Sequence, residues 1–181
     1  SDEERVEKEL KKSDDEDKKL IDELTRRLRE SLKRLEEEVR RAREELDKSD
    51  EEVRKAGVSE ELLTRLEKMS REHKKRIDDL LRRAKEVTER HERKLEEIHK
   101  RTKDMSDDHR RKIEDLRAKG GVREDIERLL DHNRKVLEKS ADDLRKLLKT
   151  NEEILRRVAK AIRDLLEHNR RVVEEVKERA R

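Results

Sequence analysis

The sequence predicts an all-α fold, a long, nearly straight antiparallel (up-down-up) three-helix bundle that uses residues 1–181 as a single domain. Charged residues make up 58% of the chain, which has no aromatic residue, proline or cysteine, a composition typical of long helices or of disorder. Apolar residues recur with the period of a helix, which favours helices. Glycine occurs only at positions 57, 120 and 121, and these positions divide the chain into three segments.

The first predicted helix covers residues 2–56. The opening tetrapeptide SDEE has the spacing of a capping box, and Gly57 can adopt the left-handed conformation that closes a helix. The apolar positions of this helix repeat every 18 residues, at Leu10, Leu28 and Leu46. Eighteen residues make five turns of about 3.6 residues, the period of a helix that does not supercoil. We therefore expect this helix to run nearly straight.

The second predicted helix covers residues 59–119. Ser59 is placed to cap it, and acidic residues follow in the first turn, where the helix dipole favours them. Val58 and Leu63 have the spacing of a hydrophobic staple. The 18-residue repeat continues at Leu62, Leu80, Ile98 and Leu116.

The third predicted helix covers residues 123–181, after a loop at 120–122. It keeps the same repeat at Leu129, Leu147 and Leu165, alongside Val136, Ile154 and Val172. It also has surplus apolar residues, namely Leu130, Leu137, Leu148, Leu155, Leu166 and Val173. Two explanations fit this surplus: a helix buried more deeply between its neighbours, or a face that contributes to assembly.

Polar residues follow the same 18-residue repeat. His73, His91 and His109 form one series, and Asn133, Asn151 and Asn169 form another. In a hairpin closed at residues 120–121, residues at the same level have numbers that add up to about 242. His109 with Asn133, His91 with Asn151 and His73 with Asn169 each add up to 242. The sequence thus predicts three His–Asn pairs between the second and third helices. Unpaired buried polar groups cost about 1–3 kcal/mol each, so such layers penalise wrong registers.

Further polar residues lie beside these layers. His132 and His168 flank the first and last pairs, and Thr150 takes the matching place in the middle pair. His99 is level with Asp143, which allows a contact between them. A third series consists of Ser13, Ser31 and Ser49. Taken in opposite order, the serines and histidines of the three series form pairs whose residue numbers add up to 122. The loop at Gly57 predicts that level residues of the first two helices have numbers that add up to about 116. Either the first hairpin is staggered, or the serines belong to layers next to those of the histidines.

Buried histidines predict a response to pH. Burial disfavours the charged imidazole, so the pKa of a buried histidine falls below its unfolded value near 6.5. The stability that depends on neutral histidine is then present above that value and is lost as the pH falls below it. With six histidines, the folded state loses up to about 8 kcal/mol of stability per pH unit in the pH range where only the unfolded chain binds protons.

The straight-helix repeat, idealised loops and mixed Glu/Lys/Arg surface resemble a de novo designed parametric bundle with built-in hydrogen-bond networks. The segments DHNR (131–134) and EHNR (167–170) resemble the inner helices of designed pH-responsive oligomers. As one long chain with six histidines, the protein most resembles designed filament subunits that assemble at neutral pH and come apart in acid. This resemblance implies a self-assembling structural protein. The alternative is a designed bundle that stays monomeric and is either pH-sensitive or merely hyperstable.

Other function classes are not favoured by the sequence. It has no phosphate-binding glycine loop and no cysteine nucleophile, so we expect no enzyme, cofactor or small-molecule ligand. Two imidazoles per layer are fewer than the three or four ligands of a zinc site, so we expect no metal. Charges of both signs are interleaved around a net charge of +3, which argues against nucleic-acid binding, and no apolar run is long enough to span a membrane. The expected partner is the protein itself.

Overall fold

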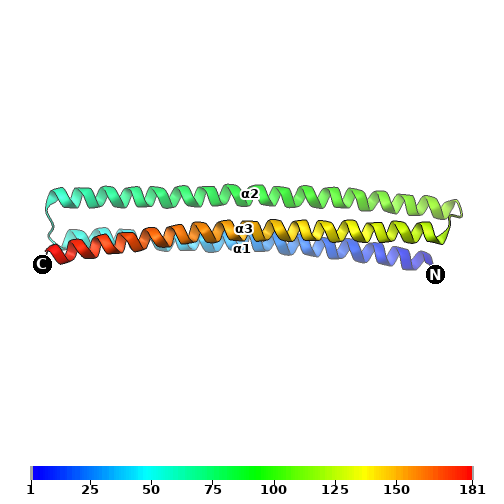
Figure 1. The fold of residues 1–181 in the computed structure, drawn as a ribbon, viewed down its shortest axis with the longest axis horizontal. Coiled ribbons are helices and arrows are strands. Elements are labelled where there is room, and N and C mark those ends of the chain that lie inside the picture. The colour runs from blue at the N-terminus through cyan, green and yellow to red at the C-terminus, as the bar shows by residue number, and fades with distance from the viewer. Residues whose placement is uncertain (1, 181) are drawn as a thin grey trace. The chain divides into compact units, whose positions relative to one another are not determined.

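Three helices account for nearly all of the chain. The computed structural model describes residues 2–180 and places α1 at Asp2–Lys55, α2 at Glu60–Ala118 and α3 at Arg123–Ala180. All three pairs of helices are in contact, and the described part contains no strand. The chain reverses direction after α1 and again after α2 (Figure 1). The predicted all-α, antiparallel three-helix bundle is therefore confirmed, and the helix ends agree with the prediction to within about one residue.

The helix ends confirm several predicted caps. Gly57 and Gly120 have positive φ values of 73° and 66°, the conformation that glycine adopts without strain. After α2, the N–H of Gly121 donates to the carbonyl oxygen of Leu116 (2.6 Å), the hydrogen bond that defines a Schellman motif. At the start of α2, the backbone N–H of Leu62 donates to Oγ of Ser59 (3.3 Å). The SDEE capping box includes Ser1, which lies outside the described residues.

The start of α3 has no polar side-chain cap. Val122 stands at the capping position, where its carbonyl oxygen accepts the N–H groups of Asp125 (3.1 Å) and Ile126 (3.4 Å). Its side chain has no acceptor atom and is 60% exposed. The N–H groups of the first turn of α3 therefore lack the side-chain acceptor that Ser59 provides for α2.

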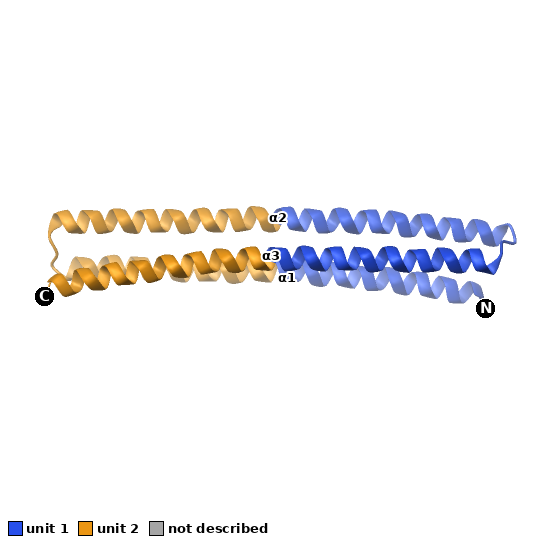
Figure 2. Ribbon diagram, in the orientation of Figure 1, with its two compact units in different colours: residues 1–28, 89–151 blue, residues 29–88, 152–181 orange. Residues whose placement is uncertain are grey.

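The described chain divides into two compact units, each containing a segment of every helix (Figure 2). Unit 1 comprises the chain up to Leu28 together with Glu89–Asn151, and unit 2 comprises Arg29–Thr88 together with the chain from Glu152 onward. Four of the six histidines, at positions 91, 99, 109 and 132, belong to unit 1. The single domain over residues 1–181 stays a prediction.

The two units differ in the size of their apolar cores. In unit 2, one cluster has eleven buried apolar residues, including Leu46 and Ile77, and a second has three. In unit 1, the two clusters have five and four buried members. Most of the surplus apolar residues of α3 belong to these cores, because Leu130, Leu148, Leu155, Leu166 and Val173 are buried. Leu137 is only partly buried. Burial therefore accounts for most of the surplus.

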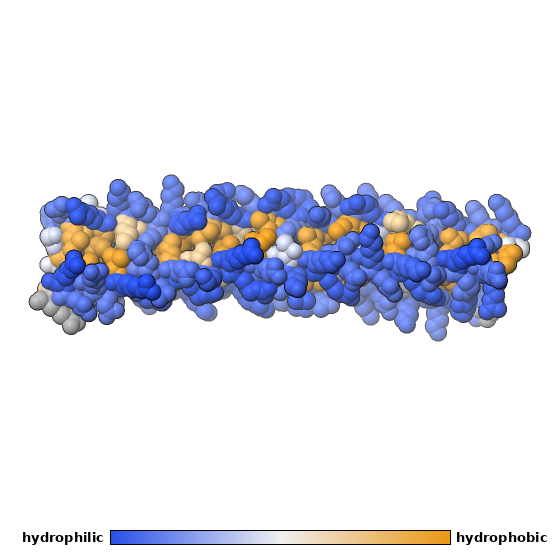
Figure 3. Space-filling model, viewed as in Figure 1, coloured by the Kyte–Doolittle hydropathy of each residue, from blue (hydrophilic) through white to orange (hydrophobic). Residues whose placement is uncertain are grey.

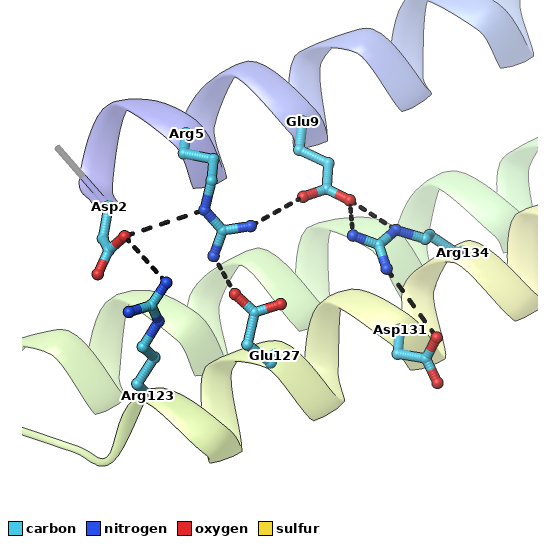
Figure 4. Close-up of polar contacts among 7 residues, drawn as sticks. All are labelled: Asp2, Arg5, Glu9, Arg123, Glu127, Asp131 and Arg134. Atoms are coloured by element: carbon cyan, nitrogen blue, oxygen red, sulfur yellow. Dashed lines mark hydrogen bonds and ion pairs between the residues drawn. The ribbon is translucent and has the colours of Figure 1, made fainter.

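Ion pairs between α1 and α3 accompany this packing in each unit. In unit 1, Arg134 contacts Glu9, and Arg5 contacts Glu127 and also lies near Glu9 (Figure 4). In unit 2, Arg163 contacts Glu38, Arg170 contacts Glu45 and Lys177 contacts Glu52, each pair 125 residues apart. The constant separation fits parallel helices with one register. Because these pairs lie at the surface, each adds little to stability.

Candidate functional site

The most buried histidine lies between α2 and α3 in unit 1. Nδ1 of His109 and Oδ1 of Asn133 are 2.9 Å apart, and both side chains are buried. A neutral imidazole that donates from Nδ1 to this oxygen keeps Nε2 as its acceptor, which defines the tautomer. The pair confirms the predicted contact between residues 109 and 133.

A second His–Asn pair lies in the same unit. Nδ1 of His91 is 2.7 Å from Oδ1 of Asn151. Asn151 is 0% exposed, whereas His91 is half-buried and reaches the surface groove between α2 and α3. This contact confirms the second predicted pair.

The third predicted pair, in unit 2, differs from the other two. The amide nitrogen of Asn169 donates to Oγ of Ser49 on α1 (3.0 Å). Nδ1 of His73 is buried and has no hydrogen-bond partner at normal distance among the described residues, although the Asn169 side chain is near enough to favour the charged imidazole. His73 and Asn169 therefore share a layer without the Nδ1–Oδ1 bond of the other pairs, because the amide is turned toward α1.

The surroundings of His73 disfavour its charged form. Burial lowers the pKa of His73, the nearby His168 lowers it further, and Asn169 and Glu72 oppose this only in part. This is the direction that the sequence predicts for a buried histidine.

The flanking residues lie at the edge of the layers. The ring of His132 meets that of His109 edge-on, with centroids 4.9 Å apart, and His168 meets His73 at 6.0 Å. His132, His168 and Thr150 are all exposed. Protonating both rings of a pair places two positive charges against each other, whereas Thr150 brings no second charge to the middle layer.

His99 contacts a different aspartate from the one predicted. Its Nδ1 lies 2.7 Å from Oδ2 of Asp17 on α1, and Asp143 instead lines the groove beside His91. Burial raises the pKa of Asp17, while His99 acts to lower it. The expected contact with Asp143 was wrong because α1 brings a carboxylate to the other side of the imidazole.

The serine series is only partly included in the layers. Ser49 joins the Asn169 layer, whereas Ser13 and Ser31 are half-buried and form no hydrogen bond within the described part of the chain. Between α1 and α2, the hydrogen-bonded residues Asp50 and Ser70 have numbers that add up to 120. The hydrogen-bonded residues Asp17 and His99 have numbers that add up to 116, so the contacts between α1 and α2 do not follow one constant sum.

Two repeated clusters between α1 and α2 were not predicted. In unit 2, Asp50 accepts hydrogen bonds from Ser70 (3.0 Å) and Lys74 (3.3 Å). The matching residues 36 positions away form a cluster in unit 1, where Asp14 accepts from Ser106 (3.3 Å) and Arg110 (2.7 Å). A search for polar residues repeated at 36 residues, twice the apolar repeat, would have found both clusters.

Another polar contact that the sequence analysis missed lies between α2 and α3 of unit 1. The hydroxyls of Thr102 and Ser140 are 2.7 Å apart in a buried contact. The positions 36 residues away in unit 2 are the apolar residues Leu66 and Val176. This pair and the His99–Asp17 contact make the interior of unit 1 more polar than that of unit 2.

Among residues 2–180, no group of three or more His, Asp or Glu side chains is arranged to hold a metal ion. No described helix has an apolar stretch long enough to cross a membrane. Comparison with known proteins finds no family model, no curated protein and no solved structure that matches the chain.

Proposed function

We propose that the protein is a structural, self-assembling subunit whose fold and assembly are lost in acid, when the histidines between α2 and α3 become charged. The buried His109–Asn133 pair, with the ring of His132 against it, is the observation that carries this proposal. The self-assembly and the designed origin come from the resemblance of the sequence and stay predictions.

The acid response comes from charge rather than from a broken hydrogen bond. An amide oxygen accepts a hydrogen bond from a charged imidazole as well as from a neutral one, so the contact between His109 and Asn133 survives protonation. The cost is the burial of a positive charge, together with repulsion from a protonated His132. The neighbouring carboxylate of Asp108 is exposed and paired with Lys112, which limits its compensation.

The other histidines face different charges. His73 faces His168 and Asn169 from α3, Ser49 lies in the same layer on α1, and Glu72 is its neighbour on α2. His91 faces Asn151 from α3. It shares the groove with one carboxylate, Asp143, and with four cations, namely Lys94, Arg101, Lys139 and Lys146. His99 faces a carboxylate, because its Nδ1 lies 2.7 Å from Oδ2 of Asp17.

The triple variant His73→Asn/His91→Asn/His109→Asn tests the mechanism. We expect it to lose most of the acid transition, followed by circular dichroism between pH 8 and pH 4, because asparagine stays neutral over this range. The matched control, His132→Asn/His168→Asn, removes only exposed imidazoles and should retain a clear transition. An unchanged midpoint and steepness in the triple variant would refute the protonation mechanism.

Electron microscopy at neutral pH tests the assembly. Fibres that disperse on acidification are the expected result. Dispersed single particles at neutral pH would contradict assembly and favour the alternative, a monomeric bundle, without affecting the acid response of the fold.

A further inference from the structure

A surface groove with an apolar floor runs between α2 and α3 in unit 1. It has a volume of about 880 Å³. Its apolar lining consists of Ile98, Met105, Val136 and Leu147. Met105 is 43% exposed and is one of two large apolar side chains that are exposed in the described chain. In Figure 3, apolar residues are visible in the furrow between α2 and α3.

The charges around this groove are mainly positive. Four cations line it, namely Lys94, Arg101, Lys139 and Lys146, against a single carboxylate, Asp143. Within the described chain, none of these four cations forms an ion pair. An apolar floor with a basic rim favours a partner that presents apolar side chains among carboxylates.

A second groove in the same unit, between α1 and α3, has the opposite charge. It has a volume of about 590 Å³, and its apolar lining is Leu20, Leu137 and Ala141. Five carboxylates line it, at Glu9, Glu16, Asp17, Glu138 and Asp142, against three cations, at Lys12, Arg134 and Arg145. Among the described residues, Glu16 and Glu138 form no ion pair, so their charges are available to a partner.

We propose that the basic α2–α3 groove of one copy docks against the acidic α1–α3 groove of a second copy. Pairing the basic groove with itself would bring like charges together, which disfavours a two-fold dimer at this surface. Pairing two different surfaces leaves one copy with a free acidic groove and the other with a free basic groove. Such a heterologous contact can add further copies without closing, as a fibre requires. This inference rests on the self-assembly in the proposed function.

Charge reversal in each groove provides the test. The basic-groove variant is Lys139→Glu/Lys146→Glu, and the acidic-groove variant is Glu16→Lys/Glu138→Lys. All four residues are exposed, so helix formation should persist, and circular dichroism checks this. The control for net charge is Lys100→Glu/Lys103→Glu, two exposed α2 residues outside both grooves.

At neutral pH and low salt, we expect each groove variant alone to lose assembly, as measured by light scattering and electron microscopy. An equimolar mixture should regain it, because one variant has two acidic grooves and the other has two basic grooves. The control should assemble like the unchanged protein. Assembly of either groove variant alone, loss of assembly in the control, or no recovery in the mixture would overturn the groove pairing. If the unchanged protein does not assemble, both the groove pairing and the proposed assembly are wrong. The acid response of the fold is measured separately, by circular dichroism, and does not depend on this outcome.

Discussion

Replacing His73 with leucine should stabilise unit 2, although the substitution removes a member of a polar layer. Nδ1 of His73 is buried without a hydrogen-bond partner, and such an atom costs about 1–3 kcal/mol. Asn169 donates to Ser49 on α1, and we expect it to keep this hydrogen bond in the variant. We therefore expect His73→Leu to raise the free energy of unfolding by about 1–3 kcal/mol at pH 8.

The gain should be larger in acid. Burial holds the pKa of His73 below its unfolded value, so the unfolded chain binds the proton more readily than the folded chain does. The stability that depends on neutral His73 is complete above about pH 6.5 and falls as the pH drops toward the folded pKa. Leucine has no such dependence, so the difference between the variant and the unchanged protein should grow from pH 8 to pH 5.

Urea unfolding followed by circular dichroism at the two pH values measures both effects. The matched control is His168→Gln, an exposed position in the same layer, where we expect a change within about 0.5 kcal/mol at pH 8. A loss of stability in His73→Leu at pH 8, or an equal difference at both pH values, would show that the orphaned nitrogen and its protonation do not govern this layer.

Three further predictions follow from contacts and from the distribution of polar groups. In urea unfolding, Val122→Asp should stabilise the protein by about 0.5–2 kcal/mol, because the aspartate supplies the missing side-chain cap of α3. Ser59→Ala should destabilise the protein by a similar amount, because it removes the cap of α2. No gain in stability from the aspartate would contradict the capping argument. Ser140→Ala and Thr102→Val should each cost about 1 kcal/mol, and the double variant should cost less than their sum; strict additivity would show that the two hydroxyls do not interact. On acidification, amides of unit 1 should lose hydrogen-exchange protection at a higher pH than amides of unit 2, because unit 1 has smaller apolar clusters and contains the buried His109; simultaneous loss of protection, after correction for intrinsic exchange, would refute this order.

The register between α2 and α3 was predictable to the residue. The loop closed by Gly120 and Gly121 is short, and the helical repeat is constant, so residue numbers alone placed His109 opposite Asn133. The contacts between α1 and α2 were less predictable, because hydrogen-bonded pairs there have numbers that add up to 116 for Asp17 and His99 and to 120 for Asp50 and Ser70. The 36-residue repeat of Asp14 and Asp50 was present in the sequence, but its meaning depended on how α1 packs against α2.

The partners of His99 and Asn169 show what tertiary structure added. Both residues had several acceptors or donors within reach of their layers, and sequence spacing cannot rank them. The position of α1 decided the outcome, since it brings Asp17 to His99 and Ser49 to Asn169.

By itself, the sequence determined three helices, their ends and the levels of the His–Asn layers, because helix periodicity and glycine-closed turns act locally along the chain. Only the tertiary structure decided which groups pair within each layer, and that His73 is left with an unbonded nitrogen. The physical reason is that hydrogen bonds depend on distances of a few tenths of an ångström and on side-chain direction, which three packed helices set jointly.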